Sequence, residues 1–168
     1  PHAADTRRQG LAETSCDRVV GSHSHEFKKR QLSRHKLNLI NSAGVASIDI
    51  CMRKKSIYNV VKFDECFGLG TDLPSGEEYI FITDAIKSGL KVIKQNEICS
   101  LHPFEASGND FYSTYERVDA KHKMMKRIFN GFGTVFFVVF FFKKSHFLYS
   151  KSKLSLFLKY AYKSVFKS

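Results

Sequence analysis

One run of apolar residues near the carboxyl end limits what this chain can fold into. From Gly131 to Phe142 the sequence reads Gly-Phe-Gly-Thr-Val-Phe-Phe-Val-Val-Phe-Phe-Phe, and Lys143 and Lys144 follow directly. The run is shorter than the about 20 apolar residues that a membrane-spanning helix needs. Two states can cover its surface: a helix packed on the rest of the domain, or a helix lying in a membrane interface. The sequence leaves both open.

The net charge favours an anionic partner. The 168 residues include 27 Lys and Arg and 16 Asp and Glu, a formal charge of +11, and such an excess attracts nucleotides, nucleic acids or acidic lipid. No Asp or Glu follows Asp119. Residues 146–168 alternate Lys with apolar residues, which predicts a basic amphipathic helix. No nucleic-acid-binding module accompanies it, so we expect an anionic membrane surface and no nucleic acid.

The pattern ahead of the apolar run predicts a mixed α/β domain. The expected strands are at 18–21, 45–52, 90–93 and 98–101, and the expected helices are at 56–60, 76–88 and 115–130. Ser75-Gly76-Glu77-Glu78 matches the S-x-x-E capping box of a helix start, and Gly89 fits the residue that follows a helix end. Residues 63–75 form a loop longer than a simple connection, which predicts a functional role.

The cysteines and the amino-terminal region indicate a cytoplasmic protein. Cysteines at positions 16, 51, 66 and 99 contain no C-x-x-C pair, so we expect free thiols rather than a zinc knuckle or a disulfide scaffold. No signal-peptide pattern follows Pro1. His23 and His25 could bind a metal as a pair, but in a Ser-rich loop they are expected to be solvated.

Four motifs in a fixed order carry a resemblance to a known family. They are Phe63-Asp64-Glu65-Cys66-Phe67-Gly68-Leu69-Gly70, Glu77-Glu78, Gly89 before a Lys-Val-Ile strand, and Leu101-His102-Pro103. Together they resemble the second half of family 2 glycosyltransferases of the GT-A type, and Asp17 to Gly21 resembles a strand of that family farther upstream. The resemblance covers about residues 1–120. It implies a partial GT-A, nucleotide-diphospho-sugar transferase-like domain at 1–120, followed by a basic, Phe-rich helical tail at 121–168.

The resemblance implies an enzyme that transfers a sugar from a nucleotide-sugar donor to a glycan or lipid-linked acceptor, in bacterial surface polysaccharide synthesis. Glu78 stands where the family has the Asp of its acidic pair, which implies a general base for the acceptor hydroxyl. Glu77 would orient that base or hold the acceptor. Both carboxylates also suit a helix N-terminus, so a capping role stays open.

The same resemblance implies roles for the loop and for a histidine. Asp64 and Glu65 match the pair that shapes the loop over the acceptor, and either direct sugar contact or a turn fixed by Asp fits them. Gly68 and Gly70 are expected to supply positive φ or a close backbone approach. His102, at a strand end, is a candidate metal ligand that suits Mn²⁺ better than Mg²⁺.

One expected motif is absent from the chain. GT-A enzymes hold a divalent ion on an Asp-x-Asp sequence, and this sequence has none. We therefore expect Mg²⁺ or Mn²⁺ in a full-length enzyme, with its main ligands in a donor half that ends just before Pro1, and a fragment inactive alone. Its expected location is the cytoplasm, peripheral on the inner face of the membrane. The alternative is a non-catalytic basic domain that binds membrane or nucleic acid.

Overall fold

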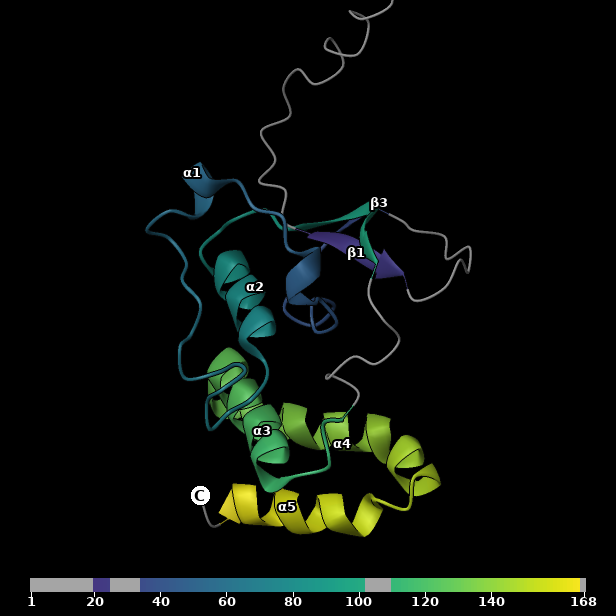
Figure 1. The fold of residues 1–168 in the computed structure, drawn as a ribbon. Coiled ribbons are helices and arrows are strands. Elements are labelled where there is room, and N and C mark those ends of the chain that lie inside the picture. Colours follow the sequence, from purple (N-terminus) through teal and green to yellow (C-terminus); the bar gives the residue numbers. More distant parts are fainter. Residues whose placement is uncertain (1–19, 25–33, 102–109, 167–168) are drawn as a thin grey trace, which may run out of the picture.

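A computed structural model describes residues 20–24, 34–101 and 110–166 of the chain. It shows a mixed α and β molecule, rich in helix, with a small sheet beside one helix and three further helices below (Figure 1). The elements in chain order are β1 (Val20–Ser24), β2 (His35–Lys36), η1 (Ser47–Asp49), α1 (Lys54–Ile57), α2 (Glu77–Lys87), β3 (Ile93–Leu101), α3 (Tyr115–Phe129), η3 (Asn130–Phe132), α4 (Gly133–Ser150) and α5 (Leu154–Phe166).

The sheet has the order β1-β3-β2, with β1 parallel and β2 antiparallel to β3. Because β1 and β3 are parallel, the chain between them must cross over, and it does so through η1, α1 and α2. The expected strand at 18–21 is found at Val20–Ser24, and residues 18 and 19 lie outside the described part. Two strands were expected at 90–93 and 98–101, whereas the structure has the single strand β3.

Leu90 lies in the turn that ends α2 and not in a strand. Gly89 takes a left-handed φ of 83°, and its amide donates to the Ile86 carbonyl at 3.1 Å while the Leu90 amide donates to the Ala85 carbonyl at 3.0 Å. These two bonds form a Schellman motif, which ends the helix and satisfies its last carbonyls. The predicted glycine at the helix end is thus confirmed.

The predicted strand at 45–52 is wrong, because this segment contains the short helix η1 and irregular backbone. The Asp49 amide donates to the Ala46 carbonyl at 2.9 Å, and the Asp49 carboxylate accepts the Ala46 amide at 3.4 Å. Side-chain bonds of this kind compete with strand pairing. The short helix expected at 56–60 begins earlier, as α1 at Lys54.

The predicted capping box at the start of α2 is also wrong. The N-cap is Gly76, with a left-handed φ of 112° and no side-chain cap, so Ser75 does not fill this role. A Cβ at Gly76 would lie 2.7 Å from Sδ of Met124. The left-handed φ favours glycine, and any larger residue here would also force Met124 of α3 to shift.

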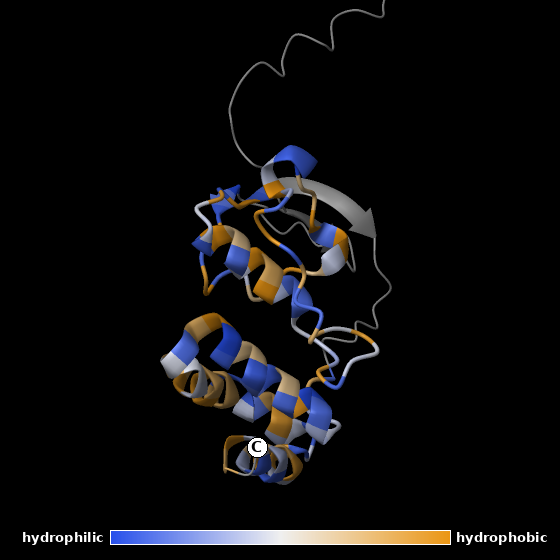
Figure 2. Ribbon diagram, turned by 90° about the vertical axis from the view of Figure 1, so that its left-hand side faces the viewer, coloured by the Kyte–Doolittle hydropathy of each residue, from blue (hydrophilic) through white to orange (hydrophobic). Residues whose placement is uncertain are grey.

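Helix α2 connects two hydrophobic clusters. One cluster joins α2 to the segment before it and to the start of β3, through Leu37, Ile57, Val61, Phe81, Ile82, Ala85 and Val92. The other joins α2 to α3, α4 and α5, through Phe67, Tyr79, Ile80, Phe111, Val118, Met124, Met125, Ile128, Phe137, Leu148 and Phe157. Figure 2 shows hydrophobic and hydrophilic residues along the helices of both parts. Both sides of α2 are therefore buried.

The apolar run begins in η3 and continues in α4, which extends beyond the run to Ser150. Phe137 is buried, whereas Phe142 on another side of the helix is 67% exposed. Of the two states left open by the sequence, packing on the domain is confirmed for one face of α4. The single helix expected at 146–168 is wrong, because the chain turns at Ser152, with a φ of 55°, before α5 begins. The predicted boundary between 120 and 121 lies inside α3.

A buried polar network fastens α4 and α5 to α3. The Ser164 hydroxyl donates to Asp119 Oδ1 at 2.7 Å, and His122 Nδ1 lies 2.8 Å from the same hydroxyl oxygen. His122 Nε2 lies 3.1 Å from the Thr134 hydroxyl. Because the Ser164 proton is used on Asp119, the His122 Nδ1–H must donate to Ser164 and Nε2 must accept from Thr134. All three helices contribute to this network.

Candidate functional site

The loop at 63–75 is held in a compact shape by its own backbone. The Gly68 amide donates to the Leu73 carbonyl at 2.9 Å, and the Thr71 hydroxyl donates to the Gly68 carbonyl at 2.9 Å while accepting the Leu73 amide at 3.1 Å. Gly68 and Gly70 have φ of 122° and 89°, values that side chains other than hydrogen rarely permit. The positive φ predicted for both glycines is confirmed.

Glu77 lies directly beneath this loop. A Cβ at Gly68 would be 3.3 Å from both Cδ and Oε1 of Glu77, so the loop backbone rests on the carboxylate. The second oxygen, Oε2, is buried and has no hydrogen-bond partner within the described ranges. A buried carboxylate oxygen without a donor is costly, and the hydroxyl of a ligand is one group that could supply the missing bond.

Lys121 of α3 places a positive charge beside both glutamates. Its ammonium is partly buried, and burial lowers the pKa of Lys121, whereas the negative charges of Glu78 and Glu77 act in the opposite direction. Lys121 lies three residues before Met124, which contacts Gly76, and residues at this spacing share a helix face. The start of α2 thus presents two carboxylates and one amine in one place.

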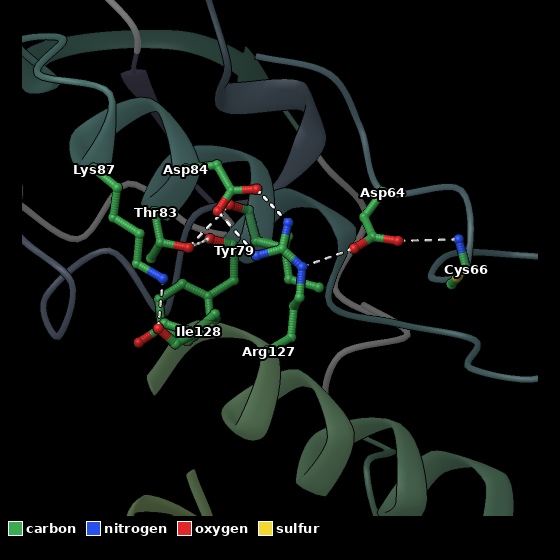
Figure 3. Close-up of polar contacts among 9 residues, drawn as sticks. Asp64, Cys66, Tyr79, Thr83, Asp84, Lys87, Arg127 and Ile128 are labelled. Carbon is green, nitrogen blue, oxygen red and sulfur yellow. Dashed lines mark hydrogen bonds and ion pairs between the residues drawn. The ribbon is translucent and has the colours of Figure 1, made fainter. Parts of the chain in front are cut away.

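Asp64 serves as an anchor of the loop. Its Oδ1 accepts the Cys66 amide at 3.2 Å, which fixes a local turn. Its Oδ2 accepts Nε of Arg127 at 3.0 Å, and the two terminal nitrogens of Arg127 bind Asp84 at 3.2 and 2.8 Å (Figure 3). The turn predicted for Asp64 is observed, and its contact with a sugar stays a prediction. Glu65 is exposed, and its contact with an acceptor stays a prediction.

Arg127 ties three elements together from α3. The hydrogen bond to Asp84 and, after it, the bond to Asp64 raise the pKa of Arg127 above its ordinary value. Beside it the Lys87 ammonium donates to the Ile128 carbonyl near the end of α3 (Figure 3). A pocket of about 460 Å³ adjoins these ion pairs and is lined by Val60, Val61, Lys62, Phe63, Asp64, Asp84, Lys87, Ser88 and Arg127. Neither glutamate of the candidate site lines it.

Sequence reasoning missed Lys121 and Arg127. Each is one basic residue among many in the carboxyl-terminal third, and its partner lies about forty or more positions away in the sequence. The only local signal is the helical spacing of Lys121, Met124 and Arg127 on α3. That spacing becomes informative only once Met124 is known to pack on Gly76.

The described residues do not form a metal site. Among the residues whose side chains the structure describes, 34–95 and 110–166, there is no group of three or more His, Cys, Asp or Glu side chains that could hold a metal ion. His102 and His25 lie outside the described residues, so their predicted roles stay predictions. Cys51 and Cys66 are free and exposed.

Comparisons with protein-family models, with curated proteins and with solved structures found no match for this chain. The family resemblance therefore rests on the motifs and their order alone.

Proposed function

We propose that this chain is the acceptor side of a glycosyltransferase of the GT-A type, in which Glu77 and Glu78 act on the acceptor hydroxyl. The observation that carries the proposal is the buried, unpartnered Oε2 of Glu77 beneath the Gly68 backbone. An acceptor sugar carries hydroxyl groups that can donate to such an oxygen. Glu77 accordingly holds the acceptor, and the loop at 63–75 covers it.

Glu78 takes the proton in this mechanism. As the acceptor oxygen forms its bond to the anomeric carbon of the donor sugar, the hydroxyl proton passes to the Glu78 carboxylate. The bond between the anomeric carbon and the diphosphate breaks, and the diphosphate leaves with the electron pair. Lys121 offsets the repulsion between the two neighbouring carboxylates.

The partners in this proposal are a nucleotide-sugar donor and a glycan or lipid-linked acceptor, in bacterial surface polysaccharide synthesis. A divalent ion would assist the departure of the diphosphate, and none of the residues placed in the candidate site would hold it. The alternative function is a non-catalytic basic domain that binds membrane or nucleic acid, in which Glu77 and Glu78 only favour the start of a helix. A capping box of Ser75 and Glu78 is not part of this alternative, because Gly76 rather than Ser75 is the N-cap of α2.

The test is sugar transfer by the protein of the complete reading frame, with a panel of nucleotide sugars. We expect Glu78→Gln to lower kcat by about 10²–10⁴-fold with little change in donor affinity, because a general base contributes about this much. Glu77→Gln should chiefly raise KM for the acceptor. Glu116→Gln, at an exposed glutamate in the first turn of α3, is the matched control and should leave both parameters unchanged. A Glu78→Gln enzyme with full kcat would refute the assignment of the base.

A further inference from the structure

Helix α4 exposes a stripe of apolar side chains along one side. Val135, Val138, Val139, Phe142 and Tyr149 recur at helical spacing, and Phe142 and Tyr149 are 67% and 76% exposed. The buried residues of this helix, Phe137 and Leu148, lie at other angular positions. The exposed stripe contributes nothing to the hydrophobic cluster that α4 joins. A contiguous apolar surface of this kind marks an interaction site.

Helix α5 exposes a second stripe with lysines at its borders. Leu158, Tyr162 and Phe166 follow one another at intervals of four residues, and Phe166 is 72% exposed. Lys159 and Lys163 lie along one side of this stripe and are exposed, and the Lys163 ammonium lies 3.9 Å from the ring centroid of Tyr115 on α3. An apolar stripe bordered by lysines is the pattern of a helix that lies in a membrane interface. Figure 1 shows α4 and α5 as an antiparallel pair, so both stripes belong to one structural unit.

The charge of this unit selects an anionic surface as the partner. The sequence has no Asp or Glu after Asp119, and the described parts of α4, α5 and their connection carry Lys143, Lys144, Lys151, Lys153, Lys159 and Lys163. A second copy of the chain would bring the same uncompensated lysines against one another, which opposes association through this face. Anionic lipid offers both the negative charge and the apolar depth that the stripes require.

A position across the membrane is disfavoured by the packing. One helical segment of the described chain, Tyr115–Ser150, is long and apolar enough to cross a membrane by length and composition alone. Its first part, however, supplies Val118, Met124 and Ile128 to the hydrophobic cluster, and α4 supplies Phe137 and Leu148. Spanning the bilayer would remove these residues from the cluster. Lying on the bilayer keeps them in place.

We propose that the α4–α5 pair docks this protein on an anionic lipid membrane, with its two exposed stripes at the boundary between headgroups and acyl chains. The proposal does not depend on sugar transfer, because none of its residues belongs to the candidate site on α2. A lipid-linked acceptor would make this location useful to the proposed function.

Flotation with vesicles of phosphatidylcholine, with and without phosphatidylglycerol, tests the proposal on the 168-residue chain. We expect binding only to the anionic vesicles and release by salt. The double variant Val139→Ser/Phe142→Ser should lower the partition coefficient into anionic vesicles on the order of tenfold. The triple variant Lys151→Gln/Lys153→Gln/Lys159→Gln should lower it roughly fivefold for each lysine removed. Circular dichroism and thermal melts verify that each variant is folded.

The controls remove apolar or basic side chains elsewhere on the surface. Ile40→Ser/Tyr58→Ser removes two exposed apolar side chains, and Lys54→Gln/Lys55→Gln removes two exposed lysines of α1. Both should float like the unchanged chain. Equal loss in controls and stripe variants would overturn the proposal, as would binding that ignores phosphatidylglycerol. Absence of vesicle binding together with a concentration-dependent dimer, abolished by Val139→Ser/Phe142→Ser, would identify the stripes as a protein interface instead.

Discussion

Gly76 is the single residue on which the start of α2 depends most directly. Its φ of 112° is unfavourable for any other residue, and Sδ of Met124 lies 2.7 Å from the position of a Cβ. Gly76→Ala therefore combines backbone strain with a forced shift of Met124. We expect the free energy of unfolding to fall by about 1–3 kcal/mol, as measured by urea denaturation followed by circular dichroism.

Gly44→Ala is the control for this change. Gly44 has no positive φ, and nothing lies within 4 Å of its Cβ position, so the free energy of unfolding should change by no more than about 0.5 kcal/mol. Similar losses in the two variants would show that the conformation of Gly76 and its contact with Met124 do not matter.

The residues of the candidate site differ in how far the sequence predicts them. The positive φ of Gly68 and Gly70 follows from local composition, since glycine in a compact loop usually serves this purpose. The ion pair of Asp64 could not be predicted from the sequence, because its partner, Arg127, lies 63 positions away. Lys121 was missed for the same reason. Tertiary packing alone brings these charges together.

At the scale of the elements, the predictions that hold are those whose signals come from neighbouring residues in the sequence. Helix α2 was expected at 76–88 and is found at Glu77–Lys87, because Gly89 ends it by a backbone motif that depends on neighbouring residues only. The turn between α4 and α5 contains Lys151-Ser152-Lys153, without Gly or Pro, and so gave no signal. It forms where Phe157 packs against Phe137 and Phe141, which are contacts between helices.

The network that joins α3, α4 and α5 predicts a pH dependence of stability. Burial, and after it the charge of Lys126, lowers the pKa of His122 below its ordinary value of 6.5, although Asp119 acts in the opposite direction. The unfolded chain binds a proton here at pH values where the folded chain does not. The contribution of His122 is therefore fully present above about pH 6.5 and is lost as the pH falls toward the lowered folded pKa.

We expect His122→Gln to reduce the loss of stability between about pH 7.5 and about pH 5.5, measured as the difference between urea midpoints. His146→Gln, at an exposed histidine of α4, should lose as much stability between these pH values as the unchanged chain. A His122→Gln variant with unchanged pH dependence of stability would show that His122 is not its source.

Ser164→Ala should lower the free energy of unfolding by about 1–3 kcal/mol at neutral pH, because it leaves Asp119 and His122 without a shared partner.

At the scale of the whole molecule, α2 contributes side chains to both hydrophobic clusters. Phe81, Ile82 and Ala85 face the cluster near the sheet, whereas Tyr79 and Ile80 face the helices α3 to α5. The Tyr79 hydroxyl donates to the Leu39 carbonyl, and burial raises the pKa of Tyr79 to about 12. Sequence periodicity shows that α2 is apolar on most sides but not which elements cover it.

The shared helix predicts that damage in the carboxyl-terminal helices reaches α2. Leu148 is fully buried in the second cluster, so Leu148→Ala should cost about 2–5 kcal/mol. Hydrogen exchange followed by mass spectrometry should then show faster exchange in α2 as well as in α4 and α5, because α2 keeps its protection only while both clusters are intact. Leu158→Ala, at a leucine that is 48% exposed on α5, should leave α2 unchanged. Faster exchange confined to α4 and α5 would show that these helices open independently and that α2 is held by the sheet-side cluster alone.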